Sequence, residues 1–105
     1  MEPLPQELLS AALHVIWEHG HSEDQRAVEL IAQRVPGFSA EQYAAASRLA
    51  AMLDRTAYDL AAAWFASRGK RGLYPTVDGL EERCPGFAGT DYAEAISNNI
   101  LWARK

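Results

Sequence analysis

Histidine and carboxylate residues gather in a short stretch of the first half of the chain, and such side chains can ligate metal ions. They are His14, Glu18, His19, His21 and Asp24. His14 and Glu18 lie one helical turn apart, so a helix places both on one face. However, Gly20 is expected to end that helix before His21, and no second His or Cys pair with metal-ligand spacing follows. We therefore expect a solvated helix end here, with metal binding as the alternative.

A basic junction marks the second half, where Arg68, Lys70 and Arg71 surround Gly69 and are followed by Tyr74. Clustered cations beside a tyrosine suit a phosphate or an acidic protein surface, because the ring adds a stacking face. The alternative is that the cations only favour the negative end of a helix dipole. We predict Arg68, Lys70, Arg71 and Tyr74 as partner-binding residues.

An internal repeat organises the elements that carry these residues. A shift of 49 residues, from Val35 to Cys84, superposes one Pro-Gly-Phe turn, Pro36 to Phe38, on a second, Pro85 to Phe87. The same gapless register aligns further identical pairs: Gly20 with Gly69, Val28 with Val77, Arg34 with Arg83, Tyr43 with Tyr92, Ala44 with Ala93 and Ala46 with Ala95. We predict two tandem three-helix repeats, about 5–53 and 54–104, within a single helical domain, 1–105.

The repeated turn itself favours a structural interpretation. Proline ends the preceding helix, glycine allows a positive φ, and phenylalanine anchors the turn in the core. The repeat register also places Asn98 and Asn99 where the first copy has Leu49 and Ala50. An inward-facing amide needs hydrogen-bond partners, or it lines a groove used by a ligand. We include Asn98 and Asn99 among the predicted partner-binding residues.

Apolar spacing and capping signals predict three helices in the first copy. The first begins near Pro5 and ends at Gly20. The second follows a capping box formed by Ser22 and Gln25 and ends before Pro36. The third starts at the capping box of Ser39 and Gln42, and its predicted core face consists of Tyr43, Ala46, Leu49, Ala50 and Leu53.

No helix breaker separates the two copies, so we predict one long central helix over about 40–68 that both copies share. Pro75 or Thr76 then opens a short helix that Gly79 weakens by about 1 kcal/mol relative to alanine. A last helix is expected from Gly89 or Thr90 to Ala103. The predicted fold is an all-α helical bundle.

Composition limits the function classes. The 105 residues are 49% hydrophobic and 23% charged, which is typical of a globular domain. The net charge of −4 disfavours unspecific binding to nucleic acid. The single cysteine, Cys84, excludes an intramolecular disulfide, and neither a long apolar run nor a basic signal region is present. We expect a cytoplasmic protein without membrane contact.

No catalytic triad, paired acidic motif or phosphate-binding glycine loop stands out, so we predict no enzymatic activity and no cofactor. The preferred interpretation is a non-catalytic module that binds a protein partner, in the manner of small inhibitors, antitoxins or immunity proteins. The alternative is a nucleic-acid-binding regulator that uses the basic 68–71 junction, and a metal-binding or enzymatic role comes third. The apolar stripes also allow a homodimer.

Overall fold

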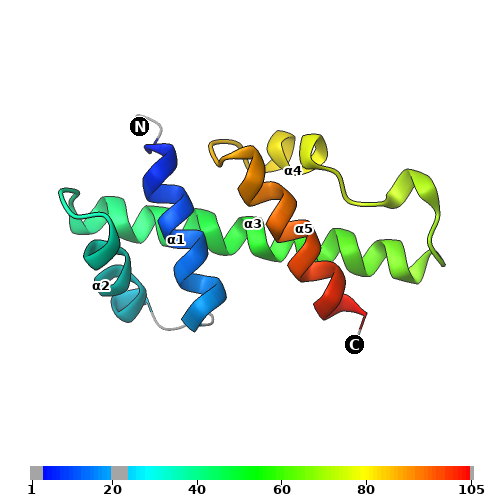
Figure 1. Cartoon of the computed structure of the whole chain (residues 1–105), viewed down its shortest axis with the longest axis horizontal. Helices are drawn as coiled ribbons and strands as arrows, with labels where there is room; N and C mark the ends of the chain where they lie inside the picture. The colour runs from blue at the N-terminus through cyan, green and yellow to red at the C-terminus, as the bar shows by residue number, and fades with distance from the viewer. Residues whose placement is uncertain (1–3, 20–23, 105) are drawn as a thin grey trace. The chain divides into compact units, whose positions relative to one another are not determined.

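The computed structural model describes residues 4–19 and 24–104, and within these ranges the chain is helical without any strand. The elements in chain order are α1 Gln6–His19, α2 Asp24–Arg34, α3 Ala40–Ala66, the 3₁₀ turn η1 Arg71–Leu73, α4 Val77–Arg83 and α5 Gly89–Ala103 (Figure 1). The all-α prediction is confirmed. Among the described helices, none combines the length and the apolar character needed to cross a bilayer.

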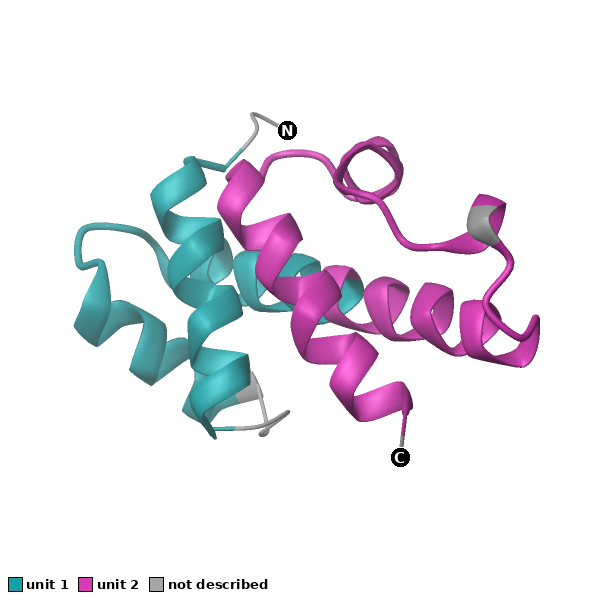
Figure 2. Cartoon of the chain, turned by 45° about the vertical axis from the view of Figure 1, so that its right-hand side comes forward, with its two compact units in different colours: residues 1–52 teal, residues 53–105 magenta. Residues whose placement is uncertain are grey.

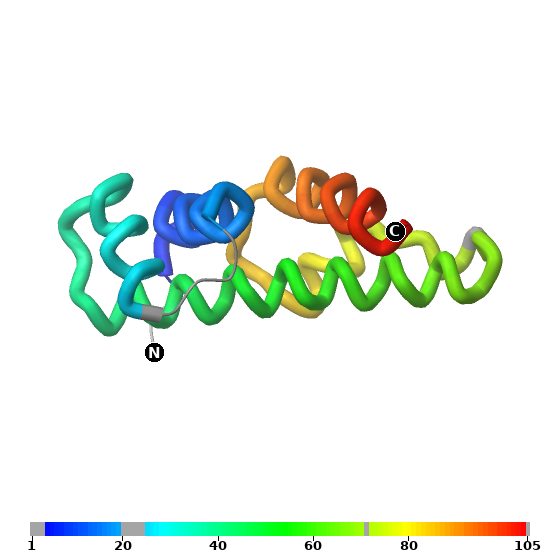
Figure 3. Tube along the Cα trace, turned by 90° about the horizontal axis from the view of Figure 1, so that it is seen from below, coloured from blue at the N-terminus to red at the C-terminus, as the bar shows by residue number. Residues whose placement is uncertain are grey.

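The chain divides into two compact units, Met1–Met52 and Leu53–Lys105 (Figure 2). The division lies inside α3, which runs as one helix through both halves of the chain (Figure 3). The predicted long helix over 40–68 ends two residues earlier than expected, at Ala66. That the two units form a single domain stays a prediction.

In unit 1, α1 packs against α2, and its apolar residues provide most of the core. Its start next to Pro5 and its end at His19 agree with the expected helix. The proposed capping box before α2 includes Ser22, which lies outside the described residues. The buried side chains of this unit are Leu8, Leu9, Ala12, Leu13, Val15, Ile16, Ala27, Ile31, Tyr43, Ala46 and Ala50.

The start of α3 confirms the second capping box. The amide of Gln42 donates to Oγ of Ser39 at 3.1 Å, and the amide of Ser39 donates to Oε1 of Gln42 at 2.8 Å. The predicted core face of this helix was wrong at Leu49, which is 39% exposed. Three residues beyond Ala46 turn a helix by about 300°, and this places Leu49 at the edge of the buried face.

In unit 2, α4 packs against α5, and the second half of α3 contributes Leu53, Ala57 and Ala61 to the core. Oγ1 of Thr76 accepts a hydrogen bond from the amide of Gly79 at 3.0 Å, so Thr76, one of the two residues predicted to open this helix, is the cap of α4. α5 begins at Gly89 and ends at Ala103, also as predicted. The remaining buried apolar residues of this unit are Leu80, Cys84, Phe87, Tyr92, Ala95 and Ile96.

A tyrosine holds the first Pro-Gly-Phe turn. The hydroxyl of Tyr43 donates to the carbonyl oxygen of Val35 at 2.6 Å and accepts from the amide of Phe38 at 3.2 Å. The ring centroids of Tyr43 and Phe38 are 6.0 Å apart, in an edge-to-face arrangement. Gly37, between them, has a φ of 105°, which L side chains rarely adopt.

The second turn has the same contacts. The hydroxyl of Tyr92 donates to the carbonyl oxygen of Cys84 at 2.7 Å and accepts from the amide of Phe87 at 3.2 Å. The rings of Tyr92 and Phe87 are 5.9 Å apart, and Gly86 has a φ of 107°. The predicted positive φ of the glycine is therefore confirmed in each unit. The predicted anchoring of phenylalanine in the core is confirmed for Phe87, which is buried, whereas Phe38 is only half-buried. We call this arrangement the tyrosine-held turn.

The buried hydroxyl of Tyr92 predicts a loss of stability in alkali. Burial raises the pKa of Tyr92, with its acidic neighbours Glu81 and Asp91 adding to the effect. An unfolded tyrosine loses its proton near pH 10, whereas the folded side chain keeps it to a higher pH. The contribution of Tyr92 to the free energy of unfolding is therefore constant below about pH 10 and decreases as the pH rises further. Chemical denaturation between neutral and strongly alkaline pH measures this slope.

Tyr92→Phe removes both hydrogen bonds and is expected to lower the free energy of unfolding at neutral pH by about 1–3 kcal/mol. Because the substitution removes the titrating hydroxyl, it should also reduce the fall of the free energy of unfolding above about pH 10. Tyr58→Phe, at a tyrosine that is 45% exposed, is the matched control and should change the stability at neutral pH little. An alkaline slope that is identical in the wild type and in Tyr92→Phe would contradict the assignment.

Candidate functional site

The end of α3 forms a tight backbone reversal in unit 2. The amide of Gly69 donates to the carbonyl oxygen of Trp64, and the amide of Arg68 donates to that of Phe65, each at 3.0 Å. These two bonds define a Schellman motif, in which the residue at the Arg68 position adopts a left-handed conformation and is usually glycine. Arg68 has a φ of 63° and is the one non-glycine residue with positive φ in the described chain.

A serine fixes the segment that follows. Oγ of Ser67 donates to the carbonyl oxygen of Trp64 at 2.6 Å and accepts from the amide of Lys70 at 3.1 Å. The amide of Leu73 then donates to the carbonyl oxygen of Lys70 at 3.0 Å and closes η1. The backbone from the end of α3 to η1 is thus held by consecutive hydrogen bonds.

An aromatic cluster supports this reversal. The ring of Trp64 lies edge-to-face with Phe65, at a centroid distance of 4.8 Å, and with Tyr74, at 4.9 Å. Tyr74 is nevertheless 46% exposed, and Leu73 beside it is 49% exposed. The contact with Trp64 therefore orients Tyr74 while leaving about half of it accessible.

We call Arg68, Lys70, Leu73 and Tyr74 the 68–74 corner. Both cations are exposed, and neither makes an ion pair within the described residues. The side chain of Arg71, the third predicted cation, lies outside the described part of the structure. The corner combines positive charge, apolar area and a held backbone, a combination that suits an acidic surface with apolar patches.

The structure gives the two predicted asparagines different environments. Asn99 is 4% exposed, and its Nδ2 donates to Oδ1 of Asp54 and to the carbonyl oxygen of Ala95, each at 2.9 Å. This buried amide is therefore used inside its own unit. Asn98 is half-buried, and within the described chain no hydrogen bond joins either asparagine to the 68–74 corner.

Two of the residues predicted as possible metal ligands, His14 and Glu18, make other contacts. A carboxylate oxygen of Glu18 forms an ion pair with the guanidinium of Arg34, and the ring of His14 lies edge-on to Trp17 at 5.2 Å. His21 and the side chain of Asp24 lie outside the described residues. Residues 4–19 and 24–104 contain no group of three potential ligands close enough to hold a metal ion.

Several residues that form or support the corner were not predicted from the sequence. Trp64, Ser67 and Leu73 were not among the predicted site residues. The available signal was a serine followed by Arg-Gly at a helix end, because a glycine shortly after the last turn indicates a Schellman motif.

Comparison with known proteins adds no assignment. No protein-family model, no curated protein sequence and no solved structure matches this chain.

The conformation of Arg68 predicts a stabilising substitution. An L residue in the left-handed region costs about 1–2 kcal/mol, and glycine avoids this cost but gains entropy in the unfolded state. Arg68→Gly is therefore expected to raise the free energy of unfolding by about 0.5–1 kcal/mol, as measured by urea denaturation. Lys70→Gly, where φ is not positive, serves as the control and should not stabilise. A loss of stability in Arg68→Gly would show that the arginine makes a compensating contact.

Proposed function

We propose that the protein is a non-catalytic binding module that captures an acidic surface of a protein partner with its 68–74 corner. The observation that carries the proposal is the half-exposed Tyr74, held against Trp64. It follows Arg68 and Lys70, which make no ion pair with the described part of the chain. Tyrosine and arginine are the residue types that most often dominate protein interfaces.

Preorganisation supports this role. Because hydrogen bonds already fix the backbone from Ser67 to Leu73, binding orders little additional chain, and less free energy is lost on association. Arg68 also occupies a position where glycine would be more stable. Backbone strain of this kind often accompanies function, and here it occurs at a cation of the corner.

The distribution of charge along the chain supports an acidic partner. The protein as a whole has a net charge of −4, yet its first 53 residues contain three arginines and seven acidic residues, whereas the remainder is balanced at seven of each. The cations of the corner therefore belong to the half without excess negative charge. Small inhibitors, antitoxins and immunity proteins act by covering a partner in this way, and we place the chain in that broad class by analogy.

The tandem repeat is part of the same proposal. The two tyrosine-held turns have the same hydrogen bonds, and buried residues recur at equivalent positions, such as Ile31 and Leu80 or Ala46 and Ala95. These similarities support an origin by duplication of one three-helix unit, over about 5–53 and 54–104. The basic junction then distinguishes the second copy as the one adapted for binding.

Photo-crosslinking followed by reconstitution tests the proposed function. A photoreactive residue replaces Leu73 or, as the control, the similarly exposed Tyr58, and the protein is irradiated in its native cells. We expect a partner attached at position 73 and absent at position 58. The dissociation constant of the purified partner should rise at least about tenfold in Arg68→Glu/Lys70→Glu and in Tyr74→Ala, and the charge effect should weaken with salt.

Arg55→Glu/Arg83→Glu introduces the same change of charge at exposed residues of α3 and α4 and should leave the affinity unchanged. Circular dichroism verifies that each variant is folded. Equal binding by the corner variants and the control variant would reject the corner. Salt-sensitive binding to nucleic acid in gel-shift assays, lost in Arg68→Glu/Lys70→Glu, would instead favour a nucleic-acid regulator.

A further inference from the structure

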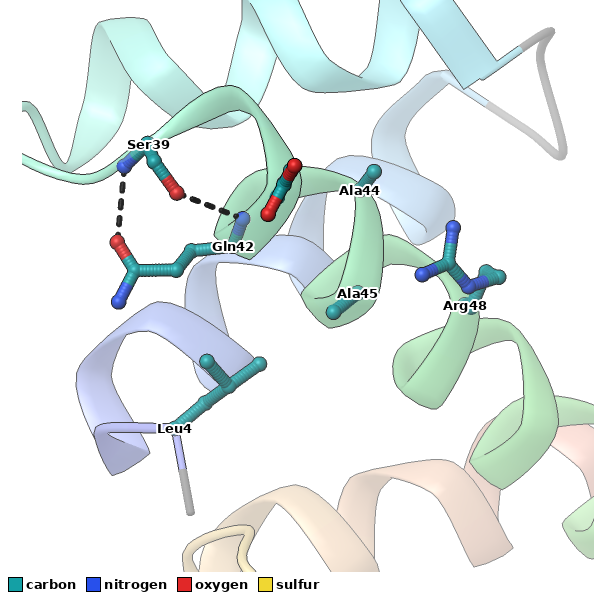
Figure 4. A pocket seen from close by; sticks show the side chains of 7 residues that line it. Leu4, Ser39, Gln42, Ala44, Ala45 and Arg48 are labelled. Carbon is teal, nitrogen blue, oxygen red and sulfur yellow. Dashed lines mark hydrogen bonds between the residues drawn. The ribbon is translucent and has the colours of Figure 1, made fainter. Parts of the chain in front are cut away.

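A hollow of about 540 Å³ lies in unit 1, at the start of α3, whereas the 68–74 corner belongs to unit 2 (Figure 4). Small side chains from α3 lie between two opposite charges in its wall. The lining residues are Leu4, Ser39, Glu41, Gln42, Ala44, Ala45 and Arg48. The hollow is thus a mixed polar and apolar surface of one helix, bordered by the chain segment before α1.

The two charged side chains of this surface are accessible to a binding partner. Glu41 and Arg48 are exposed, and neither makes an ion pair within the described ranges. Seven residues complete about two helical turns, so both lie on one side of α3, about 10.5 Å apart along its axis. Ala50, which is fully buried, is turned by about 180° from Glu41, so this side points away from the core.

We propose that this face of α3 pairs antiparallel with the same face of a second copy of the chain. The order of its residues is self-complementary. When Glu41 faces Arg48 of the second copy, Arg48 faces Glu41 of that copy, and Ala44 faces Ala45. A two-fold axis then passes between the alanines, as a closed symmetric dimer requires.

The size of the side chains fits this arrangement. Alanines at the axis let two helices approach to about 8 Å, the short end of the usual range of helix packing. Met52, which is 53% exposed, continues the stripe one turn beyond Arg48 and adds apolar area. A small ligand would need opposite charges about 10 Å apart to use both side chains, whereas a second copy supplies them in the required order.

Charge reversal with mutual rescue tests the pairing. Glu41→Lys and Arg48→Glu each convert two attractive contacts of the dimer into two repulsive ones. Each variant alone should dimerise at least about tenfold more weakly than the wild type in sedimentation analysis, and high salt should weaken the wild-type dimer. An equimolar mixture of the two variants restores both attractive contacts and should form a mixed dimer.

Glu29→Lys and Arg26→Glu are the matched controls, because they make the same changes of charge at exposed positions of α2. They should dimerise like the wild type, both alone and when mixed. The rescue in the mixture does not depend on absolute stability, so it remains informative if a variant is weakened. The proposal is overturned if the wild-type protein is monomeric up to millimolar concentration. It is also overturned if neither charge reversal changes the affinity of the dimer. Variants of the 68–74 corner should dimerise normally, so the two proposals fail independently.

Discussion

In each unit a tyrosine hydroxyl bonds to two backbone groups that the end of a helix leaves without helical partners. Tyr43 and Tyr92 each donate to the carbonyl before the proline and accept from the amide of the phenylalanine. The bond pair fixes how the chain passes from the second helix of the unit into the third. The third helix of each unit buries its apolar face in the core, so this bond pair stabilises the direction in which that helix enters the core.

Local signals predicted much of this fold. The capping box of Ser39 and Gln42 was predicted correctly, and Thr76 was one of two residues predicted to open α4, because such caps bond helix-end amides only three positions away. The absence of a breaker near residue 53 correctly predicted one long helix. Such features depend on neighbouring residues, and a single sequence contains them in full.

Features that depend on tertiary contacts were harder to predict. Leu49 has the spacing of a core residue, but its position at the edge of the buried face leaves it exposed. Asn99 was recognised as unusual, yet only the structure supplies Asp54 as its partner, 45 residues away. At the candidate site, the sequence indicated the cations and Tyr74. The left-handed backbone of Arg68 and the support from Trp64 require coordinates, because they follow from how α3 ends.

The tyrosine-held turn leaves one position open to variation. Its hydroxyl bonds to main-chain atoms, which every residue provides, so the bond does not select the side chain before the proline. That position is a half-buried valine in unit 1 and a buried cysteine in unit 2, where Sγ lies 3.7 Å from Oγ1 of Thr56. The lone thiol of the protein can therefore change to another small apolar group without disturbing the geometry on which its unit relies.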